Sequence, residues 1–138
     1  VRPNPGGWMK VLIVEDSNTL REILVRKLTT AGFETIKAEN GNRALHILSK
    51  EEDVDLVLCD SKIPEMDGFE MLRAIREDIY KAEIPFVMLI DDNNAQDQVR
   101  AIHLGANAAF FKKGIILEEV VVAIKKLINR GESKRRTL

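Results

Sequence analysis

The sequence predicts an α/β fold, in which a parallel β-sheet is covered on both faces by helices. Short runs rich in Val, Ile and Leu alternate along the chain with longer stretches whose apolar residues recur at helical spacing. Apolar runs without polar alternation are typical of strands buried on both faces of a sheet. The 138 residues, 45% of them apolar and 31% charged, suffice for one domain with its own core.

Five segments have the length and composition of strands. They are residues 11–14, 33–38, 54–59, 85–90 and 108–111. The second is the weakest, because its apolar residues alternate with Thr and Lys. Each is followed by a helical pattern, so the strands are expected to run parallel and to be joined by right-handed crossovers.

The five predicted helices follow the strands. The first is capped by Ser17 or Asn18 and stopped by Gly32, and the others are residues 42–49, 67–77, 95–104 and 117–129. Their apolar residues lie three or four positions apart, as in helices with one buried face. In the helix 95–104, Val99 and Ile102 are predicted to face the core.

The two ends differ from the predicted domain of residues 9–130. Residues 1–8 are rich in Pro and Gly, which predicts a loose extension, either an expression remnant or an upstream linker. Residues 131–138 form a charged segment that we expect to fray or to be a truncated linker.

Composition excludes several classes of protein. A net charge of -1 argues against a dominant nucleic-acid or membrane surface, and no apolar run approaches the roughly 20 residues of a membrane span. The single cysteine, Cys59, excludes an intrachain disulfide and a cysteine-based zinc site. With no recognisable signal peptide, a cytoplasmic location is the default expectation.

Charged residues follow the predicted strands. Glu15 and Asp16 follow the first strand, Asp60 follows the third, and Lys112 and Lys113 follow the fifth. Because the carboxyl ends of parallel strands meet at one edge, these groups are expected to lie together. Three ionised carboxylates in a small space require a cation, and oxygen ligands favour Mg²⁺.

This set of groups indicates phosphoryl chemistry. Asp60 could attack a phosphoryl donor and form an aspartyl phosphate, while a lysine and the metal share the charge on the transferred oxygens. Asp91 and Asp92, after the fourth strand, are interpreted as loop charges that oppose a nearby phosphate.

Several motifs resemble the receiver domain of two-component response regulators. They are VLIVEDS at 11–17, DSKIPEMDG at 60–68, PFVML at 85–89, Gly105-Ala106 and Lys112. The resemblance covers about residues 9–130. It implies a flavodoxin-like, doubly wound, five-stranded parallel sheet in the order 2-1-3-4-5 with five helices.

The resemblance also implies roles for individual residues. Glu15, Asp16 and Asp60 would hold Mg²⁺ together with the backbone carbonyl of Lys62. Asp60 would accept a phosphoryl group from a histidine kinase or phosphotransfer protein, and Lys112 would pair with a phosphoryl oxygen. Such a domain is no independent enzyme, because it catalyses only its own phosphorylation and dephosphorylation. An output domain or partner protein would read the signal, with residues 95–120 as a partner or homodimer face and no direct contact with nucleic acid or membrane.

Three positions depart from the family pattern. Ile90 stands where a Ser or Thr hydroxyl is usual, Ala109 replaces the usual aromatic, and Lys113 replaces the usual Pro. A shift of one residue would instead make Lys113 the site lysine and Phe110 the aromatic, but the spacing from Gly105-Ala106 favours Lys112.

These departures leave two functions open. A lost hydrogen bond to a charged group is worth roughly 1.5–3 kcal/mol, so Ile90 predicts a receiver that accepts phosphate but switches weakly. The alternative is a pseudo-receiver, a phosphorylation-independent protein-interaction module. An aspartate-nucleophile phosphatase is a weaker reading, because Lys62 stands where a second Asp would be expected.

Overall fold

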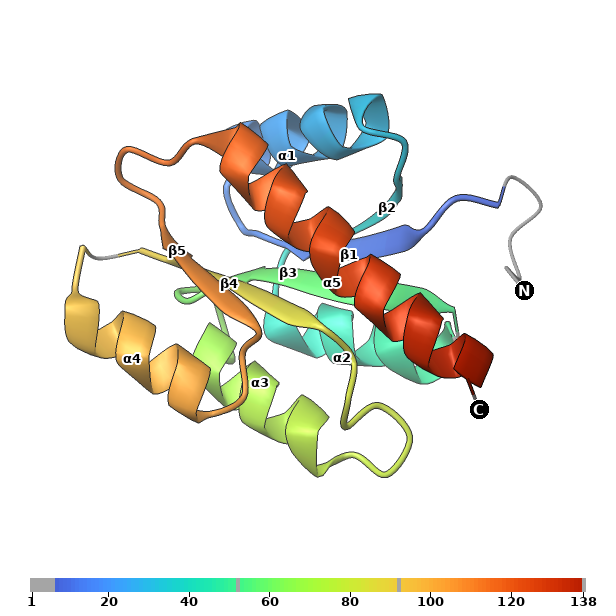
Figure 1. Ribbon diagram of the computed structural model, residues 1–138. Helices are drawn as coiled ribbons and strands as arrows, with labels where there is room; N and C mark the ends of the chain where they lie inside the picture. The colour runs from blue at the N-terminus through green and yellow to red at the C-terminus, as the bar shows by residue number, and fades with distance from the viewer. Residues whose placement is uncertain (1–6, 52, 92, 138) are drawn as a thin grey trace.

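The structure of the protein, a computed structural model, describes residues 7–51, 53–91 and 93–137 (Figure 1). Its centre is a five-stranded parallel sheet in the order β2-β1-β3-β4-β5. The strands are β1 (Lys10–Val14), β2 (Glu34–Ala38), β3 (Val54–Asp60), β4 (Phe86–Ile90) and β5 (Ala108–Phe111). The flavodoxin-like strand order implied by the resemblance is therefore confirmed.

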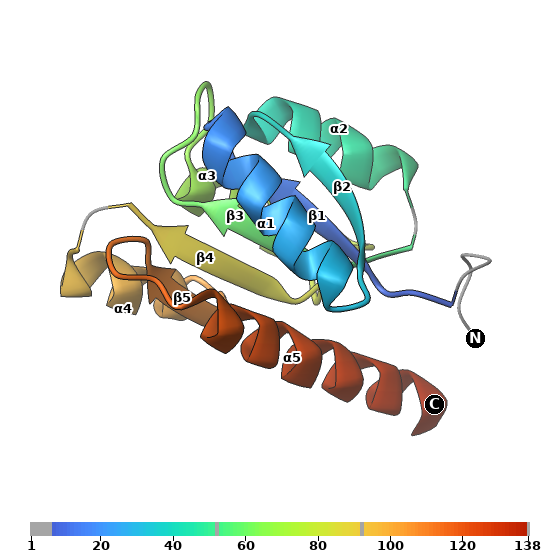
Figure 2. The ribbon, with the colours of Figure 1, turned by 90° about the horizontal axis from the view of Figure 1, so that it is seen from above.

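Five helices cover the two faces of the sheet. They are α1 (Asn18–Thr30), α2 (Gly41–Lys50), α3 (Gly68–Glu77), α4 (Ala95–His103) and α5 (Leu117–Thr137). Helices α1 and α5 pack on one face, and α2, α3 and α4 on the other (Figures 1 and 2). This division follows from right-handed crossovers, which change face where the strand order reverses.

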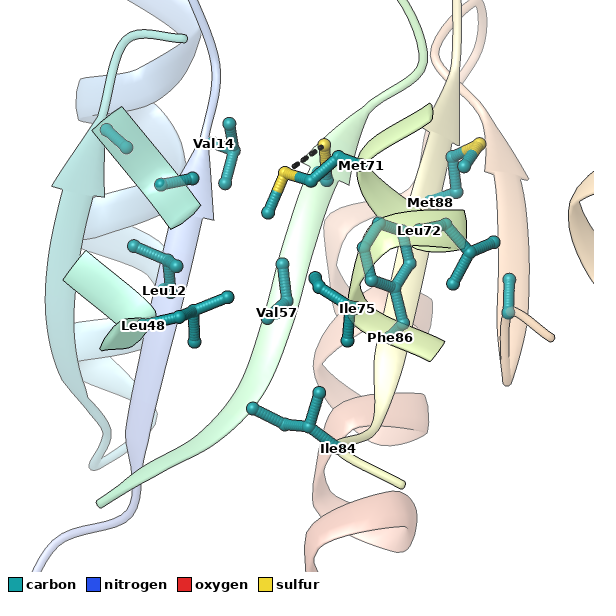
Figure 3. Close-up of a cluster of buried hydrophobic side chains, with 14 of the residues drawn as sticks. Leu12, Val14, Leu48, Val57, Met71, Leu72, Ile75, Ile84, Phe86 and Met88 are labelled. Carbon is teal, nitrogen blue, oxygen red and sulfur yellow. Dashed lines mark hydrogen bonds between the residues drawn. The ribbon is translucent and has the colours of Figure 1, made fainter. Parts of the chain in front are cut away.

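Strand alternation divides the core into two layers. In β1, Leu12 and Val14 belong to the cluster beneath α2, α3 and α4, whereas Val11 and Ile13 belong to the cluster beneath α1 and α5. Figure 3 shows the first cluster, where side chains of the central strands meet those of the helices. Because both faces are covered, β1, β3 and β4 are buried along their whole length.

Side chains before the helices satisfy their first N–H groups. Ser17, and not Asn18, caps α1, accepting from the N–H of Leu20 at 3.3 Å. Asp67 caps α3 by accepting from the N–H of Glu70 at 2.8 Å. These caps fix where the chain leaves the edge of the sheet that carries Glu15 and Asp60.

The structure corrects two predictions about helices. Val99 and Ile102 of α4 do not face the core: they are 68% and 49% exposed, and Ala101 is buried in their place. Helix α5 does not end at residue 129 but continues to Thr137. Gly131 lowers helix propensity by about 1 kcal/mol relative to alanine, yet no proline follows it to stop the helix.

The amino-terminal end of the chain is described only in part. The predicted loose segment 1–8 lies outside the described residues except for Gly7 and Trp8, which precede β1. Among the described helices, none is both long and apolar enough to cross a membrane.

Candidate functional site

The predicted acidic residues meet at the carboxyl edge of the sheet. Glu15 and Asp16 follow β1, Asp60 ends β3, and the register pairs Val14 with Cys59, which places Glu15 beside Asp60. One carboxylate oxygen from each of the three acids lies within 4.8 Å of the others. Glu15 and Asp60 are buried, whereas Asp16 is exposed.

Glu15 carries the clearest sign of a cation site. Its Oε2 accepts from the N–H of Ser17 at 3.1 Å, but its buried Oε1 has no hydrogen-bond partner. Burial and repulsion by the neighbouring Asp60 carboxylate raise the pKa of Glu15 to about 8. A buried oxygen without a donor and a destabilised carboxylate are what a hard cation would relieve, so the residues fit Mg²⁺.

Lys112 supplies the positive charge next to Asp60. Its Nζ donates to Asp60 Oδ2 at 2.6 Å and lies 3.7 Å from Glu15 Oε1. Burial opposes the charged form of Lys112, but the hydrogen bond and attraction to Asp60 outweigh it and raise its pKa. Lys113 is exposed, so the structure brings Lys112 rather than Lys113 to the site.

The chain around Asp60 is held closely by its own backbone. The N–H of Lys62 donates to Asp60 Oδ1 at 3.1 Å, which places the main chain of Lys62 at the site. The N–H of Gly68 donates to the carbonyl of Ser61 at 2.9 Å. A Cβ at position 68 would lie 2.5 Å from the carbonyl oxygen of Asp60, so only glycine fits this approach.

The sequence predicted no contact at the site for Asp91 or Ser61. Asp91, interpreted as a loop charge, accepts from Lys112 Nζ at 3.1 Å. Its N–H donates to the buried hydroxyl of Ser61 at 2.9 Å. The signal was available: Asp91 follows β4, which the strand order places between Asp60 on β3 and Lys112 after β5.

The two predicted switch positions lie beside the site but carry no group that could contact a phosphoryl oxygen. Ile90 is fully buried in the cluster beneath α2, α3 and α4. Ala109 packs against the same cluster, and its carbonyl accepts from Gln98 Nε2 of α4 at 2.9 Å. The aromatic neighbours Phe110 and Phe111 pack on opposite faces of the sheet.

The assembled groups are suited to one kind of chemistry. A buried carboxylate, Asp60, stands between an ammonium group and two further carboxylates that fit a divalent cation. Positive charge on both sides of Asp60 would let it approach an anionic phosphorus centre and would stabilise oxygens that gain charge there.

Comparisons with known proteins agree with this geometry. A family model described as the response regulator receiver domain matches residues 11–125. A chemotaxis protein CheY homolog of Campylobacter jejuni is 33% identical over 100 residues, which cover 72% of this chain and 77% of that protein. A protein of Porphyra purpurea named "Probable transcriptional regulator ycf27" is 30% identical over 123 residues, covering 89% of this chain and 49% of that protein.

A solved structure has the same architecture. The chemotaxis response regulator CheY4 of Vibrio cholerae superposes with a TM-score of 0.78 at 27% identity, covering 87% of this chain and 98% of that one. The family match extends over most of the chain, including all three acids and Lys112. The protein therefore belongs to the family of response regulator receiver domains.

Proposed function

We propose that Asp60 accepts a phosphoryl group from a histidine kinase or phosphotransfer protein in a two-component signalling pathway of the cytoplasm. The observation that supports this most directly is the 2.6 Å contact between Lys112 Nζ and Asp60 Oδ2 beside the three clustered carboxylates. That arrangement combines a nucleophile, a countercharge and a cation site in one place.

The transfer would proceed by direct attack. An oxygen of Asp60 forms a bond to phosphorus as the bond between phosphorus and the donor imidazole nitrogen breaks. The electron pair of the broken bond stays on that nitrogen. Lys112 holds a transferred oxygen through its N–H donors. Mg²⁺, held by Glu15, Asp16, Asp60 and the carbonyl of Lys62, would neutralise charge on the remaining oxygens when bound.

The signal would leave through the surface formed by α4, β5 and the start of α5, residues 95–120. Val99, Ile102 and Ile116 on this surface are 68%, 49% and 56% exposed. Exposed apolar side chains of this size favour contact with a partner protein, an output domain or a second copy of the chain. Because Ile90 and Ala109 provide no polar or aromatic switch group, this surface is expected to respond weakly to phosphorylation.

Phosphorylation can be tested by intact mass. The protein is incubated with acetyl phosphate, with Mg²⁺ or with EDTA, alongside the variant Asp60→Asn. We expect a Mg²⁺-dependent gain of one phosphoryl group in the wild type and none in the variant. A folded wild type that gains no mass would contradict the proposal.

A phosphorylation-independent pseudo-receiver is the second candidate, and Ile90 and Ala109 favour it. It predicts partner binding that does not change with acetyl phosphate. Mg²⁺ binding separates the two candidates, because a pseudo-receiver has no need of the cation, whereas the receiver requires it at Glu15, Asp16 and Asp60.

A further inference from the structure

We propose that Asp91 competes with the incoming phosphoryl group for Lys112, so that phosphorylation exchanges one ion pair of Lys112 for another. This inference rests on the proposed phosphorylation of Asp60. It makes Asp91 a positioning residue that sets both the rate of phosphorylation and the arrangement that phosphorylation disrupts.

The Asp91 carboxylate bridges two lysines at the site. Its Oδ1 lies 3.1 Å from Lys112 Nζ, and its Oδ2 lies 3.9 Å from Lys62 Nζ. Lys112 is simultaneously bonded to Asp60 at 2.6 Å. An ammonium group has three N–H donors, and Asp60 and Asp91 accept from two of those on Lys112, so Asp91 takes up a donor that could otherwise turn to a phosphoryl oxygen on Asp60.

The backbone keeps Asp91 in this position. Its N–H is anchored to Ser61 Oγ at 2.9 Å, directly after Asp60. The N–H of Lys112 donates to the carbonyl of Ile90, the residue before Asp91, at 2.9 Å. The backbone N–H groups of Asp91 and Lys112 are therefore both hydrogen-bonded to residues at the ends of β3 and β4.

Repulsion between like charges disfavours the Asp91–Lys112 ion pair once Asp60 carries a phosphoryl group. A phosphoryl group on Asp60 brings up to two negative charges to Lys112, where the Asp91 carboxylate already lies. The phosphoryl group and the Asp91 carboxylate would therefore repel each other. The Asp91 side chain is 38% exposed and that of Lys62 is 59% exposed. Asp91 can therefore rotate toward water without leaving a buried charge unpaired.

The exchange gives the end of β4 a side chain that can move, although the usual Ser or Thr hydroxyl is missing at position 90. Ile90 has no hydroxyl and is fully buried in the core, so it cannot turn toward a phosphoryl oxygen. Asp91 is the next residue, and among the described residues after β4 its side chain contacts Lys112. Release of Asp91 is thus the change at the end of β4 that phosphorylation of Asp60 would cause.

The test compares initial rates of phosphorylation by acetyl phosphate with Mg²⁺, followed by intact mass. Asp91→Ala and Asp91→Asn are expected to react about fivefold faster than the wild type, as expected for removal of a partly exposed competing charge. Asp91→Glu keeps the charge and is expected to react at close to the wild-type rate. Glu39→Ala is the matched control, because Glu39 is an exposed acid after β2 at the same edge and shows no ion pair in the described structure.

Two further readouts separate competition from a general structural effect. The ratio of the phosphorylation rate of Asp91→Ala to that of the wild type should fall as ionic strength rises, because salt screens the Asp91–Lys112 pair. Without donor or Mg²⁺, NMR of the Lys112 ammonium group should show faster hydrogen exchange with water in Asp91→Ala than in the wild type.

The outcomes are distinguishable. A phosphorylated wild type with an equal or slower Asp91→Ala variant would overturn the competition while the proposed function stands. A fast Asp91→Glu variant would also overturn it, because the charge would then not be the cause. Absence of phosphorylation in the wild type and in every Asp91 variant would overturn the proposed function itself. Phosphorylation of Asp91→Ala but not of the wild type would show that Asp91 blocks the reaction, and it would overturn the proposed function of the wild-type protein.

Discussion

Glu15 loses contact with water on folding and meets the carboxylate of Asp60, and these two effects raise its pKa from 4.5 to about 8. Between these values the folded protein holds a proton that the unfolded chain has released. Without Mg²⁺, the contribution of Glu15 to stability is therefore fully present below pH 4.5 and is lost as pH rises through 8.

The stability of the protein without Mg²⁺ should therefore fall as pH rises. In EDTA, the wild type should lose roughly 2 kcal/mol of unfolding free energy between pH 6 and pH 8, at 1.36 kcal/mol per pKa unit and per proton. Glu15→Gln should lose much less, because its side chain does not titrate. Urea denaturation at the two pH values measures both; parallel curves for the two proteins would contradict the assignment.

At the scale of elements, Arg76 joins three segments that are separate in sequence. From α3, its Nη1 donates to the carbonyls of Ala82 and Ile84 before β4, at 3.0 and 2.7 Å. Its Nε and Nη2 donate to the carbonyl of Gly105 after α4, at 3.1 and 2.8 Å. The guanidinium thus fixes both loops at the amino-terminal edge of β4 and β5.

Removing this group should cost stability but spare the chemistry. Arg76→Ala leaves these carbonyls without their charged donor, and we expect a loss of about 2–3 kcal/mol in urea denaturation. The phosphorylation rate should be unchanged, because Arg76 lies at the edge of the sheet away from Asp60. Arg73→Ala, an exposed arginine on the same helix, is the control and should cost less than about 0.5 kcal/mol. If Arg76→Ala costs as little stability as Arg73→Ala, Arg76 does not hold the two loops in place.

The elements themselves were predicted well where local pattern decides them. The five strands and five helices appear in the predicted order. A strand buried on both faces has a continuous apolar run in its sequence, and a helix buried on one face has apolar residues three or four positions apart. The orientation of α4 was predicted wrongly. Val99 and Ile102 are as apolar as a buried pair, but packing against the sheet selected Ala101, whose small side chain permits close approach.

At the scale of the whole molecule, the cation site should couple metal binding to folding. Glu15, Asp16 and Asp60 come from segments that assemble only in the folded sheet, so a bound Mg²⁺ would favour the folded state over the unfolded chain. A Mg²⁺ concentration of 100 times its Kd should stabilise the domain by about 2.7 kcal/mol.

Thermal unfolding in Mg²⁺ and in EDTA measures this coupling. We expect Mg²⁺ to raise the melting temperature, and to raise it more at pH 8 than at pH 6, because the cation must displace the proton of Glu15. Asp16→Asn, an exposed member of the same cluster, should reduce the effect. Equal melting temperatures in Mg²⁺ and EDTA would argue for the pseudo-receiver.

The sequence by itself determined the order of elements, the parallel sheet, and the arrival of Glu15, Asp60 and a lysine at one edge. These follow from local pattern and from the rule that parallel strands end together. Tertiary structure decided which side chains pair: Lys112 rather than Lys113 contacts Asp60, and Asp91 also binds Lys112. The reason is physical, since pattern locates a residue to within a position or so along the chain, whereas an ion pair depends on ångström distances between segments far apart in sequence.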